Sequence, residues 1–201
     1  MKVKYIFAVL IILSLGIIAY LQIQQKEKSN MKDTQINAAA IIKELGLLEH
    51  PEGGYFKETY RSNGEIPNTE LGESYKGDRN YSTCIYFLLT SEKFSAFHKI
   101  NQDEIWHYYK GAPLLLHIIS KDGAYSSVKI GNDFGKGEVP QYVVQGGDWF
   151  AAEVLDKNAY TLVGCTVAPG FDFADFVLPE RKDLVALFPQ HQEIIIKLTH
   201  H

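Results

Sequence analysis

A histidine and a glutamate six residues apart, His98 and Glu104, are the side chains of this sequence best suited to chemistry. Both lie in residues 97–111, a run with the pattern of two short strands joined by a tight turn, which ends in Gly111. The run therefore predicts an imidazole and a carboxylate on facing strands. Such a pair can transfer protons, because histidine titrates near neutrality, or it can supply half of a metal site.

The strand after this turn predicts a row of pocket side chains. Side chains alternate between the two faces of a strand, so Glu104, Trp106 and Tyr108 share one face. We expect this face to point inward and to bring a carboxylate, an indole and a phenol into one pocket. His107, three residues after Glu104, is expected on the opposite face.

A double glycine, Gly53-Gly54, precedes the second candidate segment. The glycines permit a backbone turn that other residues rarely adopt, and the residues after them alternate like a strand. Glu58 lies between Phe56 and Tyr60 on one face, where a charge is costly unless it is paired or functional. This face either lines the pocket or is the solvent-facing side of an edge strand. The candidate ligand-binding residues of this segment are Glu52, Tyr55, Glu58 and Tyr60.

Aromatic and acidic residues alternate near the C-terminal end of the chain, which predicts a strand over residues 172–177. Phe171 and Phe173, together with Trp149, would form an apolar wall for a flat ligand, although such residues also suit an ordinary core. The candidate ligand-binding residues of this part of the sequence, with the indole of the row described above, are Trp106, Trp149, Phe171, Phe173 and Asp175.

Short strands separated by turn residues make up most of the chain. Helices are expected only at its two ends, one running up to Leu45 with Gly46 as its stop, and a final pair over residues 181–188 and 192–198. This order of elements predicts an antiparallel barrel or sandwich. The expected strands cover residues 55–61, 82–90, 114–120, 128–130, 141–144, 149–155, 160–167 and 172–177.

Composition limits the classes of function. With 201 residues, 46% of them hydrophobic and 22% charged, the chain suits one globular domain. A net charge of −4 gives no basic surface, so we expect no nucleic-acid partner. Cys84 and Cys165 lack the spacing of a metal site and are expected to be buried free thiols, or a disulfide if the domain is exported.

An uncharged apolar run, Tyr5–Ile23, follows Lys2 and Lys4 at the N-terminus. Its 19 residues come close to the length that spans a bilayer, and no small-residue cleavage site follows it. The run predicts a membrane anchor or signal segment at residues 1–25, a linker at 26–34 and the folded domain at 35–201. We expect a membrane-anchored or exported protein with its domain outside the cytoplasm.

Four segments together carry a resemblance to a known family. The spacing His98-x-Ile100-(x)3-Glu104-(x)6-Gly111 resembles the first cupin motif, and residues 50–62, 146–153 and 164–175 resemble the cupin_5 family of that superfamily. The resemblance spans roughly residues 36–198. It implies an all-β cupin-type double-stranded β-helix, or jelly-roll barrel, with peripheral helices at both ends and the N-terminal hydrophobic helix before it. It also implies a homodimer and a small-molecule pocket inside the barrel.

Ile100 and Phe150 stand where metal-binding cupins carry further ligands, so we predict no metal and no other cofactor. Any metal would rest on His98 and Glu104 alone. Metal-free cupins that resemble deoxysugar-nucleotide 3,5-epimerases use a histidine base and a tyrosine acid. By that resemblance His98, Glu104 and Tyr108 are the candidate catalytic residues, and Tyr55 and Tyr60 are alternative phenols.

The predicted function is the binding of a small polar ligand, such as a sugar or nucleotide derivative, inside the barrel. Three classes stay open at this point. The protein is a metal-independent epimerase or isomerase, a binding module without catalysis, or a metal-dependent enzyme, which Ile100 and Phe150 disfavour. In a binding module, neighbouring groups would hold the histidine and leave no free base.

Overall fold

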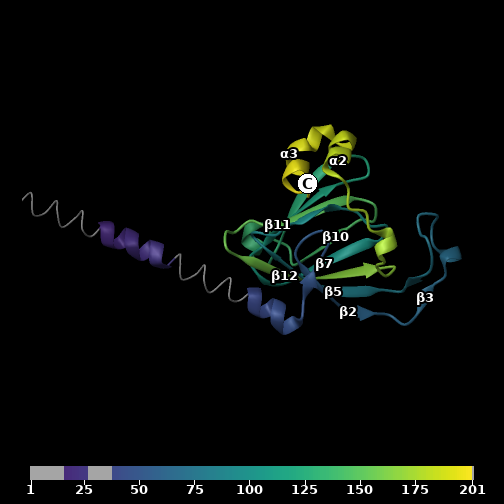
Figure 1. Cartoon of the computed structure of the whole chain (residues 1–201), viewed down its shortest axis with the longest axis horizontal. Helices are drawn as coiled ribbons and strands as arrows, with labels where there is room; N and C mark the ends of the chain where they lie inside the picture. The colour runs from purple at the N-terminus through teal and green to yellow at the C-terminus, as the bar shows by residue number, and fades with distance from the viewer. Residues whose placement is uncertain (1–15, 27–37, 201) are drawn as a thin grey trace, which may run out of the picture.

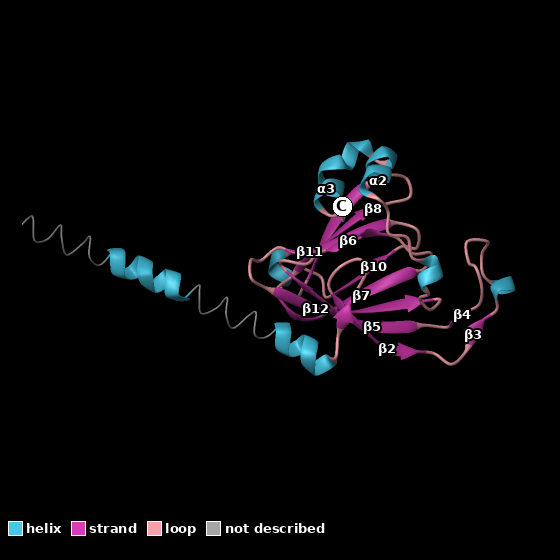
Figure 2. Ribbon diagram, in the orientation of Figure 1, coloured by secondary structure: helices cyan, strands magenta, loops and turns pink. Residues whose placement is uncertain are grey.

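Two antiparallel β-sheets face each other in the computed structural model, which describes residues 16–26 and 38–200 (Figures 1 and 2). In spatial order the six-stranded sheet contains β1 (Leu48–Glu49), β2 (Tyr55–Arg61), β5 (Thr83–Thr90), β12 (Tyr160–Ala168), β7 (Asp103–Gly111) and β10 (Gln141–Val144). The four-stranded sheet contains β6 (Ser95–His98), β11 (Trp149–Val154), β8 (Leu114–Ile119) and β9 (Tyr125–Ile130). A small third sheet pairs β3 (Glu65–Ile66) with β4 (Arg79–Asn80).

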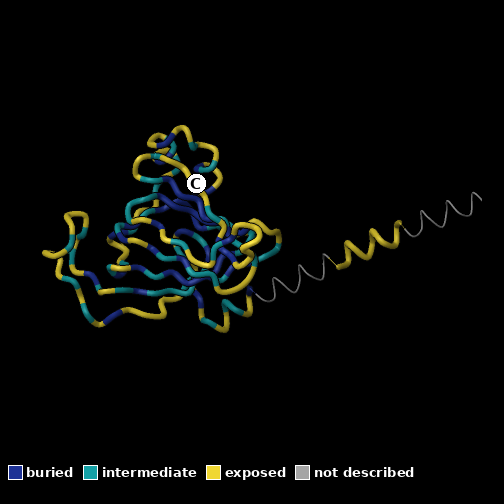
Figure 3. Tube along the Cα trace, turned by 180° about the vertical axis from the view of Figure 1, so that it is seen from behind, coloured by how far each residue is buried: buried dark blue, intermediate teal, exposed yellow. Residues whose placement is uncertain are grey.

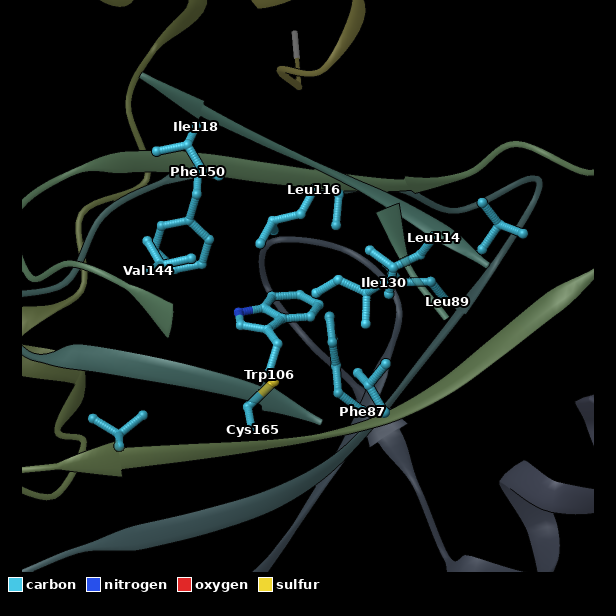
Figure 4. Packing of buried hydrophobic residues seen from close by; sticks show 14 of the residues in the cluster. Phe87, Leu89, Trp106, Leu114, Leu116, Ile118, Ile130, Val144, Phe150 and Cys165 are labelled. Carbon is cyan, nitrogen blue, oxygen red and sulfur yellow. The ribbon is translucent and has the colours of Figure 1, made fainter. Parts of the chain in front are cut away.

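The main core fills the space between the two large sheets. Phe87, Trp106 and Val163 from the six-stranded sheet meet Leu116 and Phe150 from the four-stranded sheet, and all five are almost fully buried (Figure 4). Figure 3 shows the buried residues concentrated in the central strands, with many of the exposed residues in the connecting loops. Burial of these alternating side chains fixes the register of the strands, because a shift by one residue would turn them toward water.

Helices cover the outer faces of both sheets. The helices α2 (Arg181–Leu187) and α3 (Gln192–Lys197) contribute Leu184 and Ile195 to a second core cluster with Trp149. At the other end of the domain, residues 38–45 are helical and pack near Leu88 and Tyr160 of the six-stranded sheet. The remaining short helices are the 3-10 turns η1 (Asn68–Glu70), η2 (Phe134–Lys136), η3 (Phe173–Asp175) and η4 (Pro189–His191).

Most strands predicted from the sequence are confirmed. The strands β2 and β10 have the predicted bounds, and β5, β8, β11 and β12 differ from prediction by one residue at an end. The predicted helices near the C-terminus are confirmed as well. Cys84 and Cys165 are free thiols, as the first of the two alternatives stated. The strand predicted over residues 172–177 is wrong, since η3 lies there.

The prediction of a membrane-spanning anchor is contradicted. Within residues 16–26 and 38–200, no helix has both the length and the apolar character needed to cross a bilayer. The helical part of the predicted anchor that can be described is residues 16–26, while residues 1–15 and the linker residues 27–34 lie outside the described residues. This finding overturns the membrane as a partner and the membrane-anchored or exported localisation.

Candidate functional site

A cavity of about 230 Å³ lies beside the main core, between the inner ends of the two sheets and the turn that contains η3. Its walls combine apolar side chains with a small number of acids and histidines. The lining residues are His50, Glu52, Phe56, Glu58, Arg61, Thr83, Ile85, Phe87, His98, Ile100, Glu104, Cys165, Val167, Phe171, Asp172, Phe173 and Phe176. Such a mixture is typical of small-molecule sites, where apolar walls supply contact and a few polar groups fix orientation.

The double glycine positions Glu52 at the floor of this cavity. Gly53 and Gly54 both have positive φ, +111° and +72°, as the sequence predicts for this turn. A side chain at Gly53 would collide with the carbonyl oxygen of Phe94, since its Cβ would lie 2.1 Å away. The backbone of Glu52 is also fixed, because its carbonyl oxygen accepts a hydrogen bond of 2.8 Å from the amide of Ala96. The turn therefore holds the Glu52 carboxylate against the strand β6.

Two imidazoles and one hydroxyl surround the Glu52 carboxylate. Ser95 Oγ donates a hydrogen bond of 2.8 Å to Glu52 Oε1. Glu52 Oε2 lies 3.2 Å from His98 Nε2 and 3.3 Å from His50 Nδ1. Glu52, Ser95 and His98 are buried, so solvent does not screen these contacts. The pair predicted to meet at this position was His98 with Glu104, but the closest carboxylate to His98 belongs to Glu52.

The surroundings of His98 and Glu52 indicate the protonation state of each group. His98 Nδ1 lies 2.7 Å from the carbonyl oxygen of Ala96, which only accepts, so Nδ1 carries a hydrogen. The Nε2–Oε2 contact is therefore an ion pair only when His98 also carries a hydrogen on Nε2. Burial lowers the pKa of His98. Burial alone would raise the pKa of Glu52, but His98, His50 and Ser95 together lower it. Both shifts favour an ionised Glu52 beside a neutral His98.

Glu104 reaches the same cavity from the facing sheet. It is buried on β7, and its hydrogen-bond partner is the thiol of Cys165 on β12. Burial, and then the nearby charge of Glu52, raise the pKa of Glu104 from 4.5 to about 8. Glu104 is thus a neutral carboxylic acid near pH 7 and can donate a hydrogen bond into the cavity.

A short turn, not a strand, forms the aromatic wall. The Asp172 side chain accepts a hydrogen bond of 2.7 Å from the amide of Ala174, which caps η3 and ends the extended backbone. The turn brings Phe171, Phe173 and Phe176 to the cavity. The rings of Phe171 and Phe173 meet at 5.0 Å between centroids with an angle of 79°. The predicted apolar wall exists, although its backbone differs from the predicted strand.

An ion pair lies at the edge of the cavity. Arg61 donates two hydrogen bonds to the carboxylate of Glu58, at 2.7 and 3.0 Å, and one of 3.1 Å to the carbonyl oxygen of Phe171. Glu58 therefore lines the cavity as the first of the two alternatives stated. A bulge between Glu58 and Tyr60 shifts the register of β2 against β5. Because of this extra residue, Tyr60 points to solvent and is 55% exposed.

Besides Glu104, five of the predicted site residues line the cavity. These are His98, Glu52, Glu58, Phe171 and Phe173. The structure does not bring the predicted tyrosines there. Tyr108 shares the face of Glu104 and packs against the main core, but it lies further along β7, where its hydroxyl donates a hydrogen bond to the carbonyl oxygen of Gly111. Tyr55 packs under the helical residues 38–45 and contacts Lys93.

Three further predicted residues lie outside the cavity. Trp106 is part of the main core, next to Phe87 (Figure 4). Trp149 packs toward α2 and α3 on the outer side of the four-stranded sheet. Asp175 is buried in an ion pair with Arg79, whose Nε lies 2.7 Å from Asp175 Oδ2. All three therefore stabilise the fold around the cavity without lining it.

Several cavity residues were not predicted from the sequence. His50 stacks on Phe173, with 5.8 Å between ring centroids, and the other missed residues include Arg61, Cys165 and Phe176. A signal for His50 does exist, because it lies two residues before Glu52 and starts the same turn. No local pattern indicates Cys165, which reaches the cavity only because β12 pairs with β7.

The donor set does not fit a metal of the kind that many cupins bind. Among residues 16–26 and 38–200, no group of three or more His, Cys, Asp or Glu side chains is placed to hold an ion. The Glu52 oxygen lies between the two imidazoles, 3.2 Å from His98 Nε2 and 3.3 Å from His50 Nδ1, and Ile100 contributes only hydrocarbon. We derive no step through a metal at this site.

Comparisons with known proteins agree with this architecture. Residues 39–179 match the family model Cupin_5, described as Cupin superfamily (DUF985). The chain is 35% identical over 170 residues to "Uncharacterized protein YML079W" of Saccharomyces cerevisiae, a match that covers 78% of this chain and 82% of the yeast protein.

Two solved structures are also similar. A hypothetical protein from Leishmania major superposes with a TM-score of 0.75 at 38% identity, over 82% of this chain and 99% of that one. Protein SO0799 from Shewanella oneidensis superposes with a TM-score of 0.73 at 35% identity, over 80% and 96%. The homodimer expected from the resemblance stays a prediction. On the family match and these relatives, the chain belongs to the Cupin_5 family of the cupin superfamily.

Proposed function

We propose that this protein binds a small organic molecule in the cavity between its sheets. The observation that carries the proposal is a cavity of about 230 Å³ with an aromatic wall on one side and the buried Glu52, His98 and Glu104 on the other. Buried acids that do not pair with a lysine or arginine are costly, and a fold that has no use for them would replace them with apolar residues. A ligand that accepts or donates hydrogen bonds to these groups accounts for their presence.

The chemistry of the walls describes the ligand in outline. Its apolar part would lie against Phe171 and Phe173, and its polar edge would meet the neutral carboxyl group of Glu104 and the Glu52–His98 pair. The small volume suits one ring or a branched group of similar size. A single ring with few hydroxyl groups fits this description, whereas a phosphate would be repelled by Glu52. A sugar-like or nucleotide-like ligand therefore stays a prediction. For a nucleotide, the prediction covers only the uncharged part that would enter the cavity.

Binding without turnover is the function that the polar contacts of His98 support best. Both of its nitrogens have partners, Nδ1 with the Ala96 carbonyl and Nε2 with Glu52. A general base needs a nitrogen that faces the substrate. His98 in this arrangement orients Glu52 and completes the floor of the cavity.

A second candidate function is proton transfer of the isomerase or epimerase type, without a metal. The observation in its favour is that Glu104, with a pKa of about 8, shares the cavity with the Glu52–His98 pair. A neutral acid and a proton-accepting pair on two sides of one ligand are the components of a two-sided proton exchange. Glu104 then takes the role of acid that the sequence assigned to Tyr108.

The binding proposal is tested by a ligand-observed NMR screen of small polar molecules against the full chain. The variant Ile85→Trp fills the cavity, so we expect it to lose every ligand that binds there. Tyr86→Trp changes the next residue of β5, which faces the other side of the sheet, and we expect it to keep them. The proposal fails if no molecule binds the unmodified protein, or if Ile85→Trp binds the same molecules equally well.

Proton transfer is tested on the ligands found in that screen. In D2O, the protein should exchange a carbon-bound hydrogen of the ligand for deuterium, and His98→Gln should abolish this exchange while the fold persists. Exchange that continues unchanged in His98→Gln removes the catalytic proposal and leaves the binding proposal intact.

A further inference from the structure

We infer that the ligand of this cavity is a small organic cation, such as a methylated or cyclic ammonium group, because aromatic rings and an excess of carboxyl groups line the same small space. This inference rests on the proposed function and adds the charge of the ligand to it. It follows from three features of the lining: the arrangement of the rings, the balance of charge, and the position of the one guanidinium group.

The rings present several π-faces to one region. Phe173 and Phe176 meet at 5.9 Å between centroids with an angle of 78°, and Phe171 and Phe176 meet at 6.3 Å with an angle of 72°. His50 stacks on one face of Phe173, with 5.8 Å between centroids, and we expect the other face to meet a group in the cavity. The negative face of an aromatic ring attracts a cation within about 6 Å of its centroid. Phe56 and Phe87 extend the aromatic lining on the side of the six-stranded sheet.

The charge balance of the lining also favours a cation. Four carboxyl groups face the cavity, Glu52, Glu58, Glu104 and Asp172. Among the described lining residues, the one Lys or Arg side chain is Arg61. Its guanidinium group is held at 2.7 Å by Glu58, and it also donates to Asn80 at 2.8 Å. It therefore neutralises Glu58 at the edge of the site. Glu104 is a neutral acid near pH 7, so Glu52 is the carboxylate at the floor that can balance a cation.

Anionic and strongly polar ligands fit this lining poorly. An anion would meet Glu52 at the floor with no free guanidinium or ammonium group among the described lining residues. A ligand with many hydroxyl groups would leave most of them against phenylalanine, where an unpaired polar group costs free energy. An ammonium group with a methylated surface suits both parts, since its charge is balanced by Glu52 and its methyl groups contact the rings.

Choline and its uncharged analogue 3,3-dimethyl-1-butanol test this inference, because they have the same shape and differ in charge. Binding of each to the full chain is measured by isothermal titration calorimetry at pH 7. We expect choline to bind at least about 10-fold more tightly than the alcohol. Phe173→Leu removes one ring face at an exposed position and should reduce this ratio by about 3-fold or more. The matched control Phe134→Leu, a substitution outside the cavity, should leave the ratio unchanged.

Each outcome decides a different claim. If the alcohol binds as tightly as choline or more tightly, the cation inference is overturned and the small-molecule cavity stands. If Phe134→Leu lowers the ratio as much as Phe173→Leu, the rings of the cavity do not select the charge and the inference is overturned as well. If neither compound binds, the inference also fails, and the NMR screen with Ile85→Trp then decides separately whether the cavity binds any small molecule.

Discussion

Two buried carboxylates on neighbouring parts of the fold, Asp175 and Glu104, have opposite surroundings. Asp175 accepts hydrogen bonds from Arg79 at 2.7 Å on both oxygens, from Gln102 at 2.6 Å and from Asn101 at 3.1 Å. Glu104 is buried to a similar degree but has no cation beside it among the residues that the structure describes. Asp175 lies behind the cavity wall and Glu104 faces into the cavity.

This difference in partners decides the protonation of the two groups. Burial would raise the pKa of Asp175, but Arg79, Gln102 and Asn101 outweigh it and lower the pKa, so Asp175 is a stable anion. For Glu104 nothing outweighs burial, and its pKa rises to about 8. A carboxylate whose acceptors are all occupied stabilises the fold, whereas one left with only a thiol as partner is free to meet a ligand.

Removing the cation from Asp175 should have the largest effect, since it turns a paired carboxylate into an unpaired one. We expect Arg79→Met to lower the free energy of unfolding by about 3–5 kcal/mol, measured by urea denaturation at pH 7. The double variant Arg79→Met/Asp175→Leu should recover much of this loss, because no buried charge is left alone. A loss below about 1 kcal/mol in the single variant would show that the ion pair does not stabilise the turn.

Replacing Glu104 with its neutral isostere should change the pH dependence of stability. Between pH 4.5 and about 8 the unfolded chain has lost the Glu104 proton and the folded protein keeps it, so this group makes stability fall as pH rises. The contribution is fully present below pH 4.5 and is lost as the pH passes through about 8. In Glu104→Gln a slope of at most about 1.4 kcal/mol per pH unit disappears.

This change is measured by denaturation of both proteins from pH 4 to pH 9. Glu70→Gln, on the exposed turn η1, is the matched control and should keep the slope of the unmodified protein. Parallel profiles for Glu104→Gln and the unmodified protein would contradict the raised pKa of Glu104.

A smaller loss of stability is expected when Glu52 loses one of its hydrogen-bond donors. Glu52 would then resemble Glu104 in having fewer polar partners. Ser95→Ala removes the 2.8 Å hydrogen bond to Glu52, which should cost about 1.5–3 kcal/mol of stability and raise the pKa of Glu52. Urea denaturation and carbon-13 NMR titration of the carboxyl group measure the two quantities. Ser82→Ala removes a hydrogen bond of 3.0 Å to the neutral Val167 carbonyl and should cost about 1 kcal/mol or less. Equal losses in both variants would mean that Ser95 does not stabilise a charge.

The smallest effect concerns the one side-chain partner of Glu104. The hydrogen bond with Cys165 lowers the pKa of Glu104 slightly against the effect of burial. We expect Cys165→Ala to raise this pKa and Cys165→Ser, which donates more strongly, to lower it, with stability changes of about 1 kcal/mol. NMR titration of Glu104 in the two variants checks the opposite signs. If both variants shift the pKa of Glu104 in the same direction, the thiol of Cys165 is not its hydrogen-bond partner.

The sequence alone predicted the parts of the structure that depend on local alternation. It predicted most of the strands, the family, and that His98 and Glu104 face one pocket, because period-two patterns and short motifs encode them. It did not predict that the carboxylate beside His98 is Glu52. It did not predict that β6 and β7 belong to different sheets, nor the pairing of Arg79 with Asp175, which are 96 positions apart. Contacts between residues so far apart in the sequence leave no local pattern.

Single-residue irregularities account for most of the remaining errors. A register shift between Glu58 and Tyr60 turns Tyr60 to solvent. Strict alternation places this phenol inside, so one extra residue in a strand is enough to reverse the prediction. Tyr108 does share the face of Glu104, but it lies further along β7, where its hydroxyl bonds to Gly111. At residues 172–177 the capping bond of Asp172 produces a turn where alternation predicts a strand.

The aromatic turn is fastened to the body of the protein at both of its ends. Gly170 donates to the carbonyl oxygen of Asn80 at 2.7 Å, and Val177 exchanges two backbone hydrogen bonds with Lys99, at 2.9 and 3.0 Å. These anchors use main-chain atoms and do not depend on the side chains between them. The phenylalanine side chains of residues 171–176 are therefore exchangeable as long as Asp175 keeps its ion pair with Arg79. Relatives or engineered variants can acquire a new ligand preference by exchanging these side chains, while the acids that meet the ligand stay in place on the sheets.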